Sequence, residues 1–348
     1  MLGVRRFTPV DRPRCRLAHD SIIHPIIIHQ RSNTLGAVYP TLRRSARLTV
    51  ATALLIGLAG CGSDDQSPDA SSTSAPQAGC ANETTSGRDG VNLLPVAPAK
   101  VTVVDAGTGD KRIAAAGPER GTPQSLTLVT TSSVASAGDE QAQTVEMPMD
   151  ARFHCTDSTD LEMTLGTVTS PEMVLDDQLK AVAGSQAGLA IGPGSMPISL
   201  RLLPAEGAGP EARSAVEQSL VQALQLSVPV PTEPIGVGAR WRVERTINSA
   251  ATVTQQIDAT LRSRDGNRLV VDVAVDETPV NSVFAIPGSG QTLHIARFSN
   301  TGTGQLTLDL TRGLPVAGTI RVGGARELVG SDPARPLVQR TGFSVTWR

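Results

Sequence analysis

The sequence predicts a mainly β domain: a curved antiparallel sheet, arranged as a half-barrel or a sandwich, with one or two helices packed on a face. Two patterns in residues 90–348 support this fold. Short segments with alternating apolar and polar residues recur between Gly-, Pro- and Asp-rich breaks, which is typical of strands with one buried face. One segment instead repeats its apolar residues at intervals of three and four, which is typical of a helix.

The alternating segments run to the end of the chain. Asp265-Gly266 lies between two of them and is a strong hairpin signal, because both positions of such a turn tolerate positive φ. The pattern allows either a single sheet or two sheets, over residues 90–205 and 228–348, joined by the helix. The expected strands fall within residues 145–155, 161–165, 241–247, 253–261, 269–275, 306–310, 316–322 and 343–347.

The helical period predicts a helix over residues 210–227. Pro210 is a favourable first residue, and the segment stops before Val228-Pro229. A second, shorter helix is predicted over residues 175–183, where acidic residues would lie at its positive N-terminus. The apolar stripe of the longer helix consists of Ala212, Val216, Leu220, Ala223 and Leu224.

Residues 38–60 predict a secretory signal peptide. Arg43, Arg44 and Arg47 precede thirteen mostly apolar residues that are too few for a stable membrane span. The tetrad Leu58-Ala59-Gly60-Cys61 resembles the bacterial lipoprotein signal. This resemblance implies cleavage between Gly60 and Cys61 and acylation of Cys61, which would anchor the protein to a membrane.

Residues 1–37 and 61–89 flank this signal. No Met occurs between Met1 and Met147, so residues 1–37 are either an over-extended N-terminus, with translation starting near Val38 or Leu42, or an extended cytoplasmic n-region. Residues 61–89 predict an acylated cysteine followed by a flexible tether, because their small polar side chains cannot offset the entropy of ordering.

Two cysteines remain in the exported part of the chain once Cys61 is acylated. Cys80 and Cys155 are an even pair in a compartment that permits disulfides, so we expect one bridge between them. His154 beside Cys155 suggests a metal site instead, but no third and fourth ligand occur at a recognisable spacing. We therefore expect no metal.

Charge and aromatic content exclude a nucleic-acid-binding protein. The first sixty residues carry nine Arg and two Asp, which leaves 22 basic against 31 acidic residues and a net charge of −9 in residues 61–348. That part of the chain also holds only six aromatic residues. It therefore lacks the basic surface and the stacking side chains that nucleic-acid binding uses.

The sequence offers no catalytic constellation. Only His154 and His294 follow residue 60, and no Gly-x-Ser-x-Gly motif occurs. Adjacent acids such as Asp276-Glu277 point to opposite faces of a strand, so we interpret them as solvated turn residues. We expect a protein that is not an enzyme and needs no cofactor.

Two motifs carry a resemblance that covers about residues 200–325. The strand entry Pro231-Thr-Glu-Pro-Ile-Gly-Val-Gly-Ala-Arg-Trp241 and the hairpin Gly304-Gln-Leu-Thr-Leu-Asp309 resemble those of uncharacterised bacterial lipoproteins with a domain of unknown function. The overall plan is also similar to half-barrel mycobacterial lipoproteins and to LolA-like carriers that hold acyl chains. This second likeness is one of architecture, and an architecture hosts many functions.

These features predict a lipid-anchored protein on the exported side of a bacterial membrane. One hypothesis is a carrier that binds a hydrophobic ligand, with Val216, Leu220 and Leu224 lining an apolar cavity between helix and sheet. The alternative is an envelope scaffold with a filled core and an exposed interaction patch. The expected partners are thus the membrane and either an acyl-chain ligand or an envelope protein.

Overall fold

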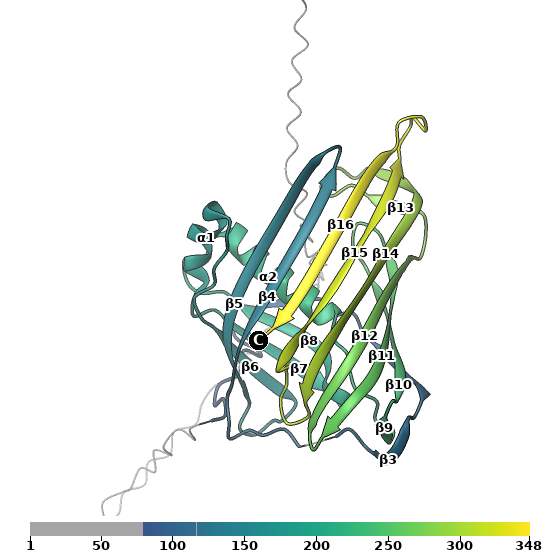
Figure 1. The fold of residues 1–348 in the computed structure, drawn as a ribbon. Helices are drawn as coiled ribbons and strands as arrows, with labels where there is room; N and C mark the ends of the chain where they lie inside the picture. Colours follow the sequence, from purple (N-terminus) through teal and green to yellow (C-terminus); the bar gives the residue numbers. More distant parts are fainter. Residues whose placement is uncertain (1–78, 116) are drawn as a thin grey trace, which may run out of the picture.

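The computed structural model describes residues 79–115 and 117–348 (Figure 1). The predicted leader, the signal peptide and the lipidation site at Cys61 lie outside these residues and stay predictions. The structure confirms the mainly β fold, with a curved antiparallel sheet that is not closed into a barrel and with helices packed on it.

Most of the strands are long, and they pair in an antiparallel manner. The strands of the first half are β1 Asn92–Leu94, β2 Lys100–Asp105, β3 Thr108–Arg112, β4 Gln124–Ser136, β5 Asp139–Phe153, β6 Asp160–Leu165, β7 Gln186–Gly192 and β8 Met196–Leu203. Those of the second half are β9 Ile235–Val237, β10 Arg240–Ile247, β11 Val253–Asp265, β12 Arg268–Pro279, β13 Val283–Ala285, β14 Thr292–Asp309, β15 Ala317–Val329 and β16 Leu337–Trp347.

A single large sheet contains strands from both halves of the chain. Its order is β1-β8-β7-β6-β5-β4-β16-β15-β14-β12-β11-β10-β2, with β13 paired to β14, while β3 and β9 form a separate ribbon. The interpretation of residues 90–205 and 228–348 as two sheets is therefore wrong. The last strand, β16, pairs with β4 from Leu128↔Trp347 to Ser136↔Gln339 and fuses the two halves.

Two helices lie where the sequence predicts them. Helix α2 spans Pro210–Gln225, and helix α1 spans Met173–Leu179 and continues as a 3-10 turn over Lys180–Val182. The apolar stripe of α2 is buried against the concave face of the sheet, where Thr130 Oγ1 of β4 donates a hydrogen bond to Ser219 Oγ at 2.9 Å. In Figure 1, α2 lies behind β4 and β16, within the curve of the sheet.

The concave face carries two hydrophobic clusters. The larger one surrounds α2 and includes Trp241, Leu128 and Met147, all fully buried. The smaller one lies where β10, β11, β13, β14 and β15 extend beyond the helix. It consists of Ile247, Ala251, Val253, Phe284, Ile295 and Leu328. The strip of the face between the two clusters is not filled by either of them.

Glycines allow β14 and β15 to approach closely on the concave face. A Cβ atom at Gly302 would overlap the carbonyl oxygen of Arg321, and one at Gly304 would overlap that of Thr319. Only a residue without a side chain fits at these two positions.

The folded domain begins earlier than the sequence suggests. The predicted tether, residues 61–89, is wrong in its last part, because residues 80–89 pack on the outer face of β6–β8. Glu162 accepts hydrogen bonds from Thr84 Oγ1 and from the Thr85 backbone and hydroxyl, and it pairs with Arg201 at 3.0 Å. Arg201 also pairs with Asp160. These charges are nearly buried, so the segment is held by a satisfied ionic network.

The predicted disulfide between Cys80 and Cys155 is confirmed. It joins the beginning of the described chain to the end of β5 across a sequence separation of 75 residues. The disulfide and the ionic network thus both attach residues 80–89 to the sheet.

We expect the double variant Cys80→Ser/Cys155→Ser to be less stable by about 4 kcal/mol, because the unfolded chain regains the freedom of a long open loop. Guanidinium unfolding under non-reducing conditions measures the change. The unchanged protein in reducing agent serves as the matched control and should show a similar loss. A loss below about 1 kcal/mol in both would contradict the stabilising role of the bridge.

Candidate ligand groove

A groove of about 1120 Å³ occupies the unfilled strip of the concave face. One wall is helix α2, and the floor is formed by β12, β14, β15 and β16. It is lined by Leu93, Leu94, Pro95, Val96, Ile198, Ser199, Pro210, Arg213, Ser214, Glu217, Gln218, Val221, Gln222, Gln225, Ile247, Asn248, Ser249, Ala251, Val253, Glu277, Phe298, Ser299, Asn300, Ala325, Arg326 and Thr341.

Apolar side chains line two sides of this groove. Leu93 and Ile198, from β1 and β8, are 65% and 55% exposed although they are large and apolar. On the opposite side lie Ile247, Val253 and Phe298, which pack with the smaller hydrophobic cluster. An apolar chain lying between these sides would remove such surfaces from water, which is favourable in proportion to the area covered.

The acids of the groove are already engaged by amide donors. Glu277 accepts hydrogen bonds from Gln255 Nε2 at 2.9 Å and from Asn300 Nδ2 at 2.7 Å, one on each carboxylate oxygen. Glu217 of α2 accepts one from Asn92 Nδ2 at 2.8 Å. These bonds stabilise the carboxylates by direct donation.

Arg326 of β15 is the partly buried cation of the floor. Its guanidinium carbon lies 4.3 Å from the centre of the Phe284 ring, and its Nε donates a hydrogen bond to Gln339 Oε1 at 2.9 Å. Burial lowers the pKa of Arg326 to about 10, which leaves it charged at neutral pH. Both partners are neutral, and no carboxylate of the described residues pairs with it.

A second buried arginine fixes the helix beside the groove. Arg245 of β10 is 4% exposed, and its guanidinium donates hydrogen bonds to the carbonyl oxygens of Leu224, Gln225 and Ser227 at 2.9, 2.6 and 2.7 Å. The last carbonyls of a helix lack partners within the helix and carry partial negative charge, so a cation is favourable there. Burial lowers the pKa of Arg245 to about 10.

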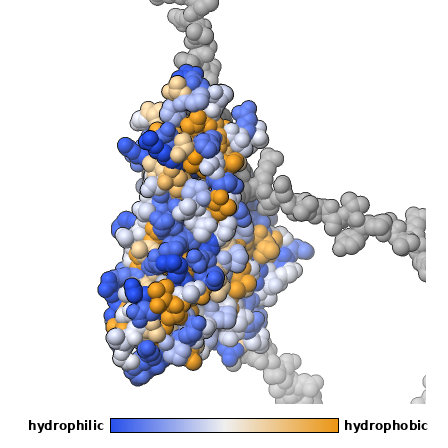
Figure 2. All heavy atoms as spheres, turned by 90° about the vertical axis from the view of Figure 1, so that its right-hand side faces the viewer, coloured by the Kyte–Doolittle hydropathy of each residue, from blue (hydrophilic) through white to orange (hydrophobic). Residues whose placement is uncertain are grey.

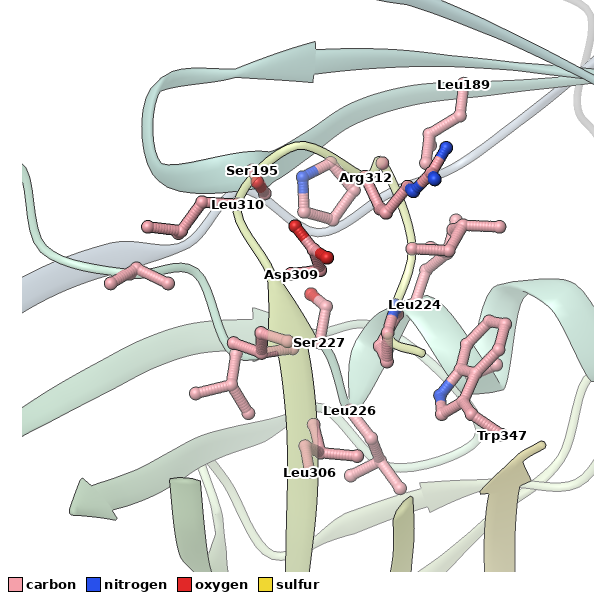
Figure 3. Close-up of a pocket in the computed structure, with 18 residues that line it drawn as sticks. Leu189, Ser195, Leu224, Leu226, Ser227, Leu306, Asp309, Leu310, Arg312 and Trp347 are labelled. Carbon is pink, nitrogen blue, oxygen red and sulfur yellow. The ribbon is translucent and has the colours of Figure 1, made fainter. Parts of the chain in front are cut away.

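A small pocket of about 50 Å³ lies at the C-terminal end of α2 (Figure 3). Leu224 and Trp347 lie side by side at its edge, and Leu306 of β14 lies below Leu226, which follows the helix. This volume has room for only a few water molecules. The pocket is therefore a gap in the core packing and too small for an acyl chain.

None of the three residues predicted to line a ligand cavity lines the groove. Val216 and Leu220 are buried in the larger hydrophobic cluster and line neither of these two pockets, because the apolar stripe of α2 seals the core. Leu224 borders only the small pocket. The groove instead faces the polar side of α2, which carries Arg213, Glu217 and Val221.

Two groove residues were not predicted from the sequence. Glu277 was expected in a solvated turn, but it lies within β12 and faces the groove, whereas Asp276 points to the exposed side. No prediction from the sequence includes Arg326. The available signal is a charged residue at a position where strand alternation requires an apolar one, as Leu328 and Val322 show on the same face of β15.

The two candidate histidines of the described chain do not come together in one site. His154 contacts Thr156 Oγ1 at 3.1 Å near the disulfide, and His294 is exposed on β14, far along the chain from it. Within residues 79–115 and 117–348, no three His, Cys, Asp or Glu side chains come together as a metal site. None of the helices in this part of the chain is both long and apolar enough to cross a membrane.

No protein-family model matches the chain, and the search of curated proteins finds no significant match.

We expect Arg245→Met to lose about 2–4 kcal/mol of stability, because the carbonyls of Gln225 and Ser227 would lose the donor that Arg245 gives them and that of Leu224 would keep only the Ser227 N–H. Arg242→Met is the matched control on the same strand. Arg242 forms an exposed pair with Asp258, so its loss should cost less than about 1 kcal/mol. Thermal unfolding of both variants decides the point, and equal losses would contradict the role of Arg245.

Proposed function

We propose that this protein is a membrane-anchored lipoprotein of the bacterial envelope that binds an amphipathic, acyl-chain ligand in the groove. The groove is the observation that carries the proposal. At about 1120 Å³ it is as large as the upper range of small-molecule sites, which is about 1,000 Å³. Binding rather than catalysis is the proposed role, and the membrane is reached through Cys61.

The distribution of side chains supports an amphipathic ligand. The apolar surfaces of Leu93, Ile198 and Phe298 suit an acyl chain, while Arg326 and Glu277 place charge on the floor. A purely apolar ligand would leave these charges desolvated without new partners, which is unfavourable. A ligand with both a chain and a polar head satisfies both kinds of surface.

A scaffold without a ligand is the less favoured function. It requires a filled core and a continuous apolar patch for a partner. The face in Figure 2 carries hydrophobic residues in small groups separated by hydrophilic ones. The groove, in contrast, is an unfilled space on the concave face of the sheet.

The membrane anchor predicts the behaviour of Cys61→Ser. Without its sulfur the chain cannot carry the thioether-linked lipid, so we expect loss of labelled palmitate and release from the membrane fraction. Cys80→Ser/Cys155→Ser is the control, since these cysteines form the disulfide and should leave labelling intact. Unchanged membrane association of Cys61→Ser would contradict the proposed membrane localisation.

Ligand binding predicts the effect of filling the groove. Gln218→Trp places a large ring on the groove side of α2, so we expect native mass spectrometry of protein extracted from its host to show much less lipid-sized adduct. Glu211→Trp is the matched control, because Glu211 is exposed on the same helix but does not line the groove. Absence of adduct from the unchanged protein would sink the carrier hypothesis.

A further inference from the structure

We propose that Arg326 binds the anionic headgroup of the ligand, a carboxylate or a phosphate monoester, with the acyl chain lying along the groove. This inference rests on the proposed function and names the chemical class of the ligand. It rests on the charged side chains of the groove. The arginines have unused hydrogen-bond donors, whereas the carboxylates already accept hydrogen bonds from amides.

The donors of Arg326 are not used by the protein. Nε donates to Gln339, but Nη1 and Nη2 donate to no acceptor in the described residues, and Arg326 lines the groove. Gln339 is 4% exposed and Phe284 is 2% exposed, so both partners are fixed in the protein interior. The guanidinium is thus held by two partners of the protein interior, while its Nη1 and Nη2 donors stay unused. Such a planar pair of donors matches the oxygens of a carboxylate or a phosphate.

The acceptors of the groove are mostly occupied. Both oxygens of Glu277 accept from amides, and one oxygen of Glu217 accepts from Asn92. The side chain of Arg213 of α2, the other arginine of the groove, also forms no hydrogen bond or ion pair with described residues. An anion therefore finds two arginines with unused side-chain donors, whereas three of the four oxygens of the two groove carboxylates already accept hydrogen bonds.

The surroundings of Arg326 suit the chain of an amphiphile. Phe298 is the cross-strand neighbour of Arg326 and lines the groove, and Ile247 and Val253 belong to the same hydrophobic cluster as Phe284. An ion pair formed in such partly desolvated surroundings is stronger than one in water. A head bound at Arg326 leaves its chain in contact with apolar walls.

The test uses the full-length protein in a nonionic detergent, freed of co-purified lipid. Palmitate, hexadecyl phosphate and hexadecanol, which have the same chain length, are titrated and counted by native mass spectrometry. We expect one or both anions to bind at least about tenfold more tightly than hexadecanol. Arg326→Gln should abolish this preference. Arg297→Gln should keep it, because Arg297 is an exposed arginine on the other face of β14.

Each outcome bears on a separate claim. Equal binding of hexadecanol and both anions by the unchanged protein overturns the anion site but leaves the acyl-chain groove in place. Binding of none of the three overturns the proposed function as well. A preference that persists in folded Arg326→Gln overturns the assignment to Arg326. If Arg326→Gln fails to fold, Arg326→Lys, which retains the charge, must keep the preference, and its loss there overturns the proposal.

Discussion

The groove depends on a mismatch of lengths: one short helix packs against a sheet of much longer strands. Helix α2 has 16 residues and is about 24 Å long, whereas β14 has 18 residues and spans about 59 Å. The helix seals the concave face only where its apolar stripe meets the larger hydrophobic cluster. The remaining part of the strands must either find another cover or stay open, and there the groove forms.

The chemistry of the strands changes beside the helix, where the groove begins. Beneath α2, the concave positions of β12 and β11 are apolar, as at Val273 and Ile257. Further along the same strands they become Glu277 and Gln255, and next to Gln255 in the register lies Arg245, which holds the end of the helix. Arg245 Nε and Gln255 Oε1 stay without partners within the described residues. The boundary between core and groove is thus a row of buried polar groups, which position the helix on one side and form the groove floor on the other.

Local patterns predicted the helices, the hairpin between β11 and β12 and the disulfide, because each depends on residues or pairings that the sequence displays directly. The loop of that hairpin is Gly266-Asn267, one residue later than the predicted Asp265-Gly266 turn. Strand β4, Gln124–Ser136, was not among the predicted strands, and Thr, Ser and Ala in its second half show no clear alternation. It is a strand because β5 and β16 pair with it on both sides. The groove also could not be predicted from the sequence. Glu277, Asn300 and Gly324 become neighbours through pairings between β12, β14 and β15, and Arg326 follows two residues later.

The N-terminal segment of the described chain is attached to the face of the sheet that lies opposite the groove. Thr85 contacts Glu162 and Arg201 on the outer face of the sheet, whereas the groove opens on the concave face. The buried network and the disulfide fix residues 80–89 there independently of α2. Movement of a ligand into the groove therefore requires no release of this segment.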